Sequence, residues 1–285
     1  MLGADIVGLM AISDDSLAAN RQAVESALLA CVTPVQACRS IDLSFEQSRW
    51  ERQALLRKVV RDCRRRPLKA HLSLLDRLEA ATLTARGAKR LSAANSCILL
   101  ASALPWHQEA ALLGRLSLSQ NASIRGQVFH RTKELSHRPL PHFIEKSWRA
   151  YRDYEATKLL IHRGQRAVVR RNFAGLEEEV QDDGALLGRL YLRLDGLAPA
   201  TLSRLRSLNP LTYAYVCTRL GKRASRSLIQ ELLVRLAGTD EFGLAAWCCG
   251  EMGYRDLLKN ALPLIDAAER RYEAERARFH ASLGV

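Results

Sequence analysis

Residues 209–221, NPLTYAYVCTRLG, and residues 240–253, DEFGLAAWCCGEMG, read as the same helix written twice. Each opens with a residue that caps helices, continues with apolar residues at helical spacing and stops at a glycine. A second apolar helix follows each one, over residues 227–237 and 257–268. The two stops, Gly221 and Gly253, are 32 residues apart. A repeat of this length predicts a stacked array of helical hairpins rather than one closed core.

The same hairpin can be followed back through the chain by the starts of its helices. First helices are predicted to begin, at intervals of 33, 34, 27, 27 and 31 residues, near Ala88, Asn121, Glu155, Asp182, Asn209 and Asp240. Second helices are predicted to begin near Pro105, Pro139, Gln165, Ala198, Ala224 and Tyr254. Aromatic residues make up only 6% of the chain, and Leu and Ala dominate its apolar set, which favours helices over a sheet. We therefore predict an all-α fold, a right-handed α-α superhelix of about six helical hairpins.

Three regions are predicted along the chain. Residues 1–66 hold N-terminal helices and a basic cluster, residues 67–268 hold the helical repeats, and residues 269–285 form a C-terminal capping helix and tail. Within the first region, Thr33-Pro34 is expected to break a helix over residues 17–31. Ser44 and Gln47 have the spacing of a capping box for a helix that ends at Cys63.

Two stretches resemble the HEAT-like repeats, which belong with the armadillo type among helical repeat proteins. Such units commonly begin Asp/Asn-Pro-x-Val-Arg and turn at a Leu-Gly. The stretches are residues 121–125, Asn-Ala-Ser-Ile-Arg, and residues 240–253 with the helix that follows them. The resemblance covers about residues 67–268. The arginine of the motif is present at Arg125, whereas Tyr213 and Leu244 occupy its place in the last two units. The resemblance implies a HEAT-like solenoid, with a concave face formed by the second helices.

Charge is the main sequence feature that points to a partner. The chain has 43 Lys and Arg against 30 Asp and Glu, a net charge of +13, and most of the excess is arginine. The planar guanidinium suits carboxylate and phosphate groups, so an anionic partner is implied. Solubility alone, or a coding bias of the source genome, would give the same composition.

Cations recur along the predicted second helices. If these side chains project inward, they make the concave surface basic; the alternative is that they lie on outer edges and only solvate the array. The candidate partner-binding residues are Arg115, Lys146, Arg149, Arg166, Arg170, Arg204, Arg226 and Arg255. The densest basic cluster lies before the repeats and includes Arg57, Arg61, Arg64, Arg65 and Arg66. The run that holds Arg166 and Arg170 is followed by acidic residues 177–179, so the two runs form either a binding patch or a structural charge complement.

Signatures of catalysis and cofactor binding are missing from the sequence. No nucleophile-elbow or phosphate-loop motif occurs, and His130, His137 and His142 lack the spacing of metal ligands. We predict no catalytic residue, no metal and no small-molecule cofactor. The seven cysteines have no metal spacing and are expected to be buried free thiols in a reducing compartment. Because the chain shows neither a signal peptide nor an apolar run that could span a bilayer, we expect a cytoplasmic protein without a membrane partner.

The sequence therefore predicts a cytoplasmic, bacterial, non-catalytic binding or scaffold protein, of the adaptor, chaperone or inhibitor type. Its most favoured partner is a protein with an acidic surface. The alternative is a nucleic-acid-binding protein. Resemblance extends this alternative to the HEAT-like alkylpurine DNA glycosylases, which hold duplex DNA in a basic groove with Trp, Asp and Arg at the lesion. Trp148 and Trp247 each have charged neighbours, but neither group reproduces the motif order of that family, and Trp247 is expected in the core.

Overall fold

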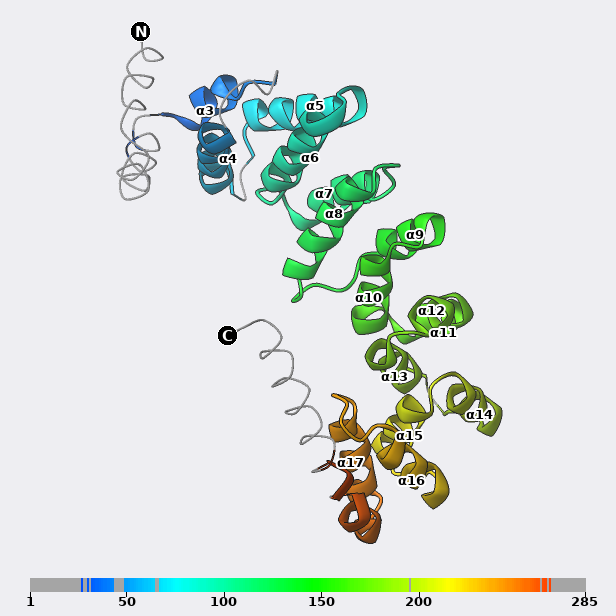
Figure 1. Ribbon diagram of the computed structural model, residues 1–285. Coiled ribbons are helices and arrows are strands. Elements are labelled where there is room, and N and C mark those ends of the chain that lie inside the picture. The colour runs from blue at the N-terminus through cyan, green and yellow to red at the C-terminus, as the bar shows by residue number, and fades with distance from the viewer. Residues whose placement is uncertain are drawn as a thin grey trace, which may run out of the picture. The chain divides into compact units, whose positions relative to one another are not determined.

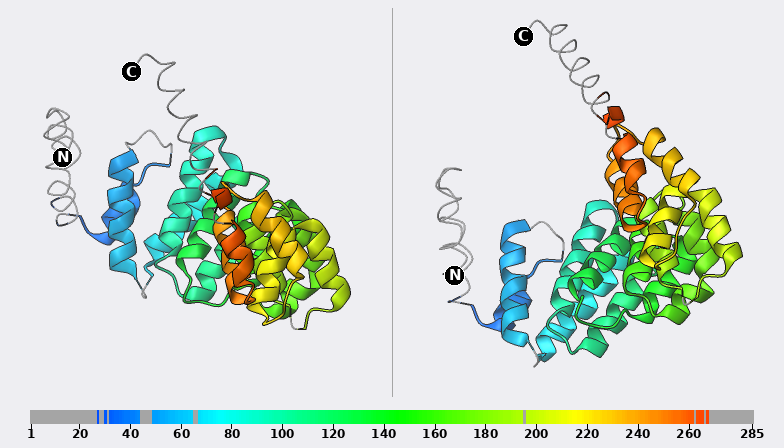
Figure 2. Two further views of the ribbon diagram at one scale, coloured as in Figure 1. Left: turned by 60° about the horizontal axis from the view of Figure 1, so that its bottom comes forward. Right: turned by 90° about the horizontal axis from the view of Figure 1, so that it is seen from below.

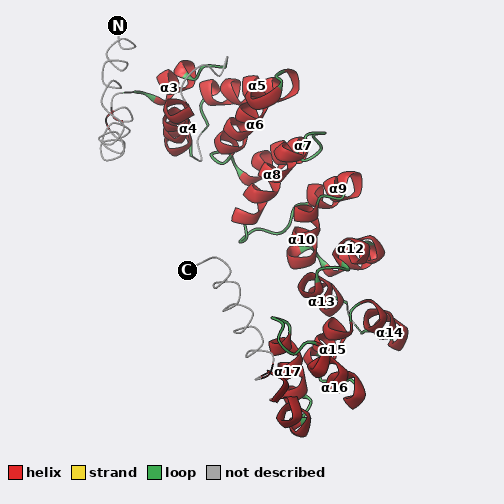
Figure 3. Cartoon of the chain, viewed as in Figure 1, coloured by secondary structure: helices red, strands yellow, loops and turns green. Residues whose placement is uncertain are grey.

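The computed structural model describes residues 27, 30, 32–43, 49–64, 67–194, 196–261, 263–265 and 267. All regular secondary structure in these ranges is helical, without a strand, as Figure 3 shows. The chain divides into two compact units, Met1–Tyr151 and Arg152–Val285, and the division falls inside the predicted repeat region. None of the helices in the described ranges has the length and apolarity needed to cross a bilayer. The capping helix predicted over residues 269–285 lies outside the described residues.

The N-terminal unit consists of hairpins stacked on a row of three helices. The row is α4 (Arg49–Cys63), α6 (Gly87–Ala101) and α8 (Ala122–Glu134), which pack side by side (Figure 1). The short α3 (Pro34–Ser40) packs on α4, α5 (Lys69–Thr84) on α6, and α7 (Trp106–Leu116) on both α6 and α8. The last helix, α9 (His142–Tyr151), is tied to the end of α7, because Ser147 Oγ donates to Ser117 O at 2.6 Å.

The C-terminal unit repeats this two-layer plan. One row is α10 (Tyr154–Arg163), α13 (Gly184–Leu192), α15 (Pro210–Arg219) and α17 (Phe242–Glu251). The other layer is α11 (Arg166–Arg171), α12 (Phe173–Val180), α14 (Pro199–Leu208) and α16 (Arg226–Arg235), and Figure 1 shows these on one side of the row. Residues 255–261 are helical after α17. Figure 2 shows the unit, coloured green to orange, from two further directions.

Hydrogen bonds between equivalent positions show that the row helices of the C-terminal unit run parallel. At their N-terminal ends, Tyr154 Oη donates to Asp183 Oδ2 at 2.6 Å, and Thr212 Oγ1 donates to Gly184 O at 3.2 Å. At their C-terminal ends, the Arg193 guanidinium donates to Gly164 O. Tyr254 Oη likewise donates to Ala224 O at 3.0 Å. All C-terminal ends of the row helices therefore lie along one edge of the unit.

The internal repeat is confirmed at the two glycine stops. Gly221 and Gly253 have φ values of 65° and 80°, the left-handed conformation that ends helices without a Cβ penalty. The residue after each glycine donates back across the last turn, Lys222 N to Cys217 O at 2.8 Å and Tyr254 N to Cys249 O at 3.0 Å. The two turns are thus the same capping motif, 32 residues apart in the chain.

The predicted helix starts are confirmed to within two residues for all six first helices. Asn121 and Asn209 are N-caps whose side chains accept backbone N–H groups, as their residue type predicts. The largest shift among the second helices is at α9, which begins at His142 and not at Pro139. Pro141 explains this shift, because a proline disfavours helical backbone at the residue before it.

One local prediction was incomplete and another was wrong. Val32 and Thr33 are not helical, in agreement with the predicted break, but Thr33-Pro34 also starts a helix that was not predicted, since Thr33 and Gln36 form a capping box and Pro34 occupies the first turn. The second helix predicted from Gln165 is divided into α11 and α12 at Asn172. The cause is local, because Asn172 Nδ2 donates to Val168 O at 2.8 Å and so competes with the helical backbone. The capping box predicted at Ser44 and Gln47 lies outside the described residues.

The prediction for the cysteines is confirmed wherever the structure describes them. All six are buried and free: Cys38, Cys63, Cys97, Cys217, Cys248 and Cys249. Burial raises the pKa of Cys38 to about 11 and that of Cys97 to about 12, so both thiols stay protonated at neutral pH. Cys31 lies outside the described residues.

Candidate partner-binding surface

Three of the predicted partner-binding arginines form ion pairs between successive helices of the layer that packs on the row helices. We call this layer the outer layer. The Arg115 guanidinium of α7 forms a bidentate pair with Glu79 of α5, with N–O distances of 2.5 and 2.8 Å. Arg204 of α14 pairs with Glu177 of α12, with Nη2 2.5 Å from Oε2. Arg226 of α16 pairs with Asp256, in the helical residues after α17. The recurrence of arginines along the chain suggested a binding surface. These three, however, each make an ion pair between stacked helices, so their recurrence is also that of a structural contact.

These three pairs differ in how strongly they hold the helices. The side chains of Arg226 and Asp256 are both more than half exposed, and an exposed pair contributes only about 0–1 kcal/mol. Glu177 is different, because its side chain is only 3% exposed and also accepts a hydrogen bond from Tyr191 Oη. Burial and this hydrogen bond raise the pKa of Tyr191, so the phenol remains a donor. Glu177 is thus buried within the C-terminal unit, whereas Arg204 reaches it from the surface with a side chain that is 64% exposed.

The other predicted cations fall into two groups. Arg149 pairs with Glu145 one turn earlier on α9 at 2.9 Å, and Arg166 and Arg170 are exposed on α11 but have interaction partners in the protein. Lys146 and Arg255 are exposed and form no ion pair with any described residue. Only these two match the prediction of a cation left available to a partner.

The described part of the N-terminal basic cluster lies on α4 and just after it. Arg57, Arg61 and Arg64 are exposed. Arg61 Nε is 3.4 Å from Asp62 Oδ1, and Lys58 Nζ is 2.7 Å from Asp62 Oδ2. The hydrogen bond from Lys58 lowers the pKa of Asp62, so this carboxylate offsets part of the local positive charge. Arg65 and Arg66 lie outside the described residues.

A further set of cations lies at the C-terminal ends of the row helices in the C-terminal unit. All are exposed, and none forms an ion pair with any residue that the structure describes. We call them the turn-edge cations: Arg189, Arg219, Lys222, Arg223 and Arg255. Arg189 and Arg219 lie in the last turns of α13 and α15, and Lys222 and Arg223 lie in the turn that follows α15.

The position of the turn-edge cations follows from the parallel row. Because the row helices end along one edge, basic residues from separate repeats are brought to that edge. Arg189 and Arg219 lie in the last turns of their helices, where the helix dipole stabilises a cation by about 0.3–1 kcal/mol. Arg193, which follows α13, adds a further guanidinium, whose pKa is lowered by burial and then by the charges of Arg166 and Arg189. The edge therefore carries positive charge that anions from outside could balance.

The tryptophans considered for a DNA glycosylase lie in different environments. Trp148 is 1% exposed, within the core of the N-terminal unit, so its ring is not available to a base. The expectation that Trp247 is in the core was wrong, because it is 38% exposed. Its ring centroid lies 6.0 Å from that of Tyr215, on the next row helix. The buried positions of α17 are Ala245, Cys248 and Cys249, and Trp247 points away from them.

Sequence reasoning singled out only Arg255 among the turn-edge cations. A local signal was present, because Lys222-Arg223 directly follows the Leu-Gly stop of a repeat. No group of three or more His, Cys, Asp or Glu side chains that could hold a metal occurs in the described part of the chain. Comparison of the chain with protein-family models, with curated proteins and with solved structures finds no match.

Proposed function

We propose that the protein is a non-catalytic binding protein of the HEAT-like type, which engages an acidic protein surface through the turn-edge cations. The repeat assignment is supported by contacts between positions about 30 residues apart: side-chain to main-chain hydrogen bonds and ion pairs in both units, and two matching capping turns in the C-terminal unit. In this proposal each unit is a short right-handed solenoid.

The observation that carries the proposal is the exposure of five cations without ion pairs among the described residues, along one edge of one unit. Carboxylates on a partner can form charge-assisted hydrogen bonds with these groups. Arg204 and Arg226, in contrast, already have carboxylate partners. Charge complementarity of this kind speeds association and selects partners by sign.

An acidic protein is favoured over a single-stranded nucleic acid by the contacts of Tyr254, the aromatic residue that directly follows the Gly253 turn. Base stacking needs an accessible ring face between the cations. Tyr254 is fixed by its hydrogen bond to Ala224 O, and the Arg226 guanidinium lies over its ring, 5.9 Å from the centroid. The ring is therefore occupied from within the protein.

The test compares two double variants that remove the same charge. Lys222→Gln/Arg223→Gln alters the turn edge, and Lys89→Gln/Lys133→Gln removes two exposed cations from the N-terminal unit that are not among the candidate binding residues. Binding of a fluorescent poly-glutamate peptide and of a short DNA duplex would be measured by anisotropy at about 50 and 150 mM salt. We expect the turn-edge variant to bind the peptide about 10-fold more weakly, from two contacts of about 0.7 kcal/mol each, and the control less than about 3-fold.

Two results would contradict the proposal. Equal weakening by both double variants would show that only net charge matters. Tighter binding of the duplex than of the peptide at the higher salt, lost in the turn-edge variant, would assign the surface to nucleic acid instead. In that case the slope of affinity against salt would report the number of phosphates contacted.

A further inference from the structure

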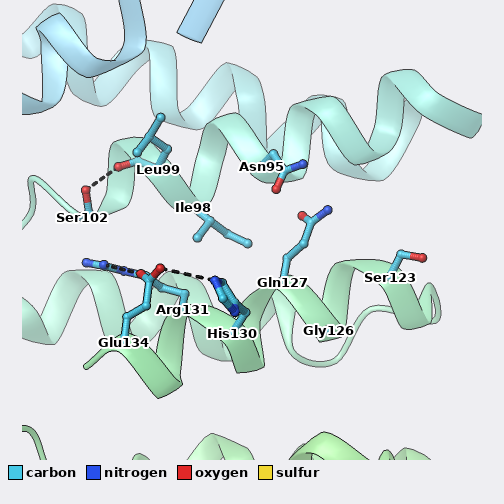
Figure 4. A pocket seen from close by; sticks show the side chains of 10 residues that line it. All are labelled: Asn95, Ile98, Leu99, Ser102, Ser123, Gly126, Gln127, His130, Arg131 and Glu134. Carbon is cyan, nitrogen blue, oxygen red and sulfur yellow. Dashed lines mark hydrogen bonds and ion pairs between the residues drawn. The ribbon is translucent and has the colours of Figure 1, made fainter. Parts of the chain in front are cut away.

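The N-terminal unit has a hollow of about 460 Å³ between the row helices α6 and α8 (Figure 4). Asn95, Ile98 and Leu99 line it from α6, and Gly126 and Gln127 line it from α8. A space of this size is within the range of ligand sites in proteins. The hollow lies outside the turn edge and belongs to the other unit, so the site proposed below is independent of the proposed function.

Gly126 borders this hollow, and no neighbouring atom requires a glycine at this position. It lies inside α8 with a negative φ, where glycine is less favourable than alanine. A Cβ placed on it would meet nothing within 4 Å. Gly188, in contrast, is needed for packing, because its Cβ would come within 3.1 Å of the Tyr215 ring. The effect of Gly126 is to leave the backbone of α8 bare where it faces the hollow.

Gln127 supplies an acceptor that the protein itself does not use. Its Oε1 is buried and has no hydrogen-bond partner among the described residues. A buried acceptor without a donor is unfavourable, so the Gln127 amide gains a partner when it turns into the hollow and meets an N–H group of a ligand. Figure 4 shows the Asn95 amide on the opposite helix, pointing toward that of Gln127. Each carboxamide offers both a donor and an acceptor, the same pair that a peptide group needs.

The apolar and charged residues that line the hollow limit which ligands can bind in it. Ile98 and Leu99 give it an apolar wall. The charged groups at one end are engaged with each other: Glu134 accepts from Arg131 Nη1 at 3.0 Å and lies 3.4 Å from His130 Nε2. Arg131 also pairs with the buried Glu109 at 2.7 Å. Glu109 and Glu134 share Arg131, so this end of the hollow does not favour an anionic ligand, and the apolar wall favours a neutral, partly apolar one.

From these observations we infer that the hollow binds an extended peptide segment that inserts one large apolar side chain. The inserted side chain packs against Ile98 and Leu99 and over Gly126. A backbone N–H of the segment donates to Gln127 Oε1, and the Asn95 amide binds the backbone from the other wall. Because the ligand is neutral at this site, its affinity depends little on salt, unlike binding at the turn edge.

The proposal is tested with a phage-displayed library of random peptides of about 12 residues, selected on the full-length protein. Enriched peptides are then synthesised and their affinity is measured by fluorescence anisotropy. Gly126→Leu fills the hollow, and Gln127→Met removes the acceptor at similar size. Gly243→Leu is the matched control, since Gly243 lies in α17 and its Cβ would also meet nothing within 4 Å.

We expect the enriched peptides to share one large apolar residue at a fixed position. Their affinity should fall by at least about 10-fold with Gly126→Leu, by about 5-fold with Gln127→Met and by less than about 2-fold with Gly243→Leu. If Gly126→Leu does not fold, Gly126→Ala and Gln127→Met carry the test, and unchanged affinity in both would overturn the proposal. A selection that yields no peptide sensitive to these variants would overturn it as well. So would peptides whose binding is lost at high salt and in Lys222→Gln/Arg223→Gln.

Discussion

The Arg204–Glu177 pair makes a sharp prediction about what holds the C-terminal unit together. In Arg204→Ala the Glu177 carboxylate stays buried, at 2% exposure, and keeps only the hydrogen bond from Tyr191. Removing one partner of a fully buried pair costs about 3–5 kcal/mol. The Arg204 side chain is 64% exposed, however, so water can approach the carboxylate from that side. A hydrogen bond to a charged group contributes about 1.5–3 kcal/mol, and we expect a loss of about 2 kcal/mol.

The measurement is urea unfolding followed by circular dichroism, where such a loss moves the midpoint by about 1 M. Arg206→Ala is the matched control on the same helix, because Arg206 is exposed and forms no ion pair with a described residue. It should change the free energy of unfolding by less than about 0.5 kcal/mol. In a Glu177→Gln background, Arg204→Ala should also cost less than about 0.5 kcal/mol, since no buried charge remains. If Arg204→Ala and Arg206→Ala proved equal, the pair would not stabilise the stack, and Arg204 would return to the candidate binding residues.

Three further predictions concern the N-terminal unit and the exposed Trp247. Burial lowers the pKa of His71 below 6.5, so the unfolded state binds the proton more readily than the folded state does. Between about pH 7.5 and 5.5, the urea midpoint should therefore fall more in the wild type than in His71→Gln. Trp148→Ala should lower the free energy of unfolding in urea by about 3–5 kcal/mol because the Trp148 ring is fully buried, and Trp247→Ala should lower it by less than about 1.5 kcal/mol. Equal losses in the two variants would contradict the assigned burial. Arg125 lies over the Tyr151 ring at 3.9 Å from its centroid, so Arg125→Lys should lower the melting temperature by several degrees; an unchanged temperature would show that the planar guanidinium is not required.

The helical architecture could be predicted because its signals are local. Asn121 and Asn209 start helices with their own side chains, and Gly221 and Gly253 end them with a backbone conformation that favours glycine. Such signals depend on a few neighbouring residues, so they predict helix ends without knowledge of the tertiary contacts. The break at Asn172 was missed because an asparagine inside a helix is tolerated unless its side chain bonds back to the chain.

The candidate sites could not be predicted, because they depend on which helix faces meet. Arg204 and Glu177 are 27 residues apart, and only the stacking of α14 on α12 makes them a pair. The turn-edge cations come from separate repeats and share an edge only because the row helices are parallel. Gly126 and Gln127 look like ordinary residues of an amphipathic helix, and their interest comes from the empty space beside them.

Five of the bonds that join one repeat to the next share an acceptor of one kind. Ser147, Tyr151, Arg193, Thr212 and Tyr254 each donate from a side chain to a main-chain carbonyl of the preceding repeat. Every amino acid provides that carbonyl, so each of these five bonds places a chemical requirement on only one of the two repeats it connects. The Tyr154–Asp183 hydrogen bond and the ion pairs such as Arg204–Glu177 differ, because they require a matching side chain on both repeats. A duplicated hairpin would therefore keep the first kind of bond beside any neighbour, and the second kind only beside a repeat that carries the partner residue.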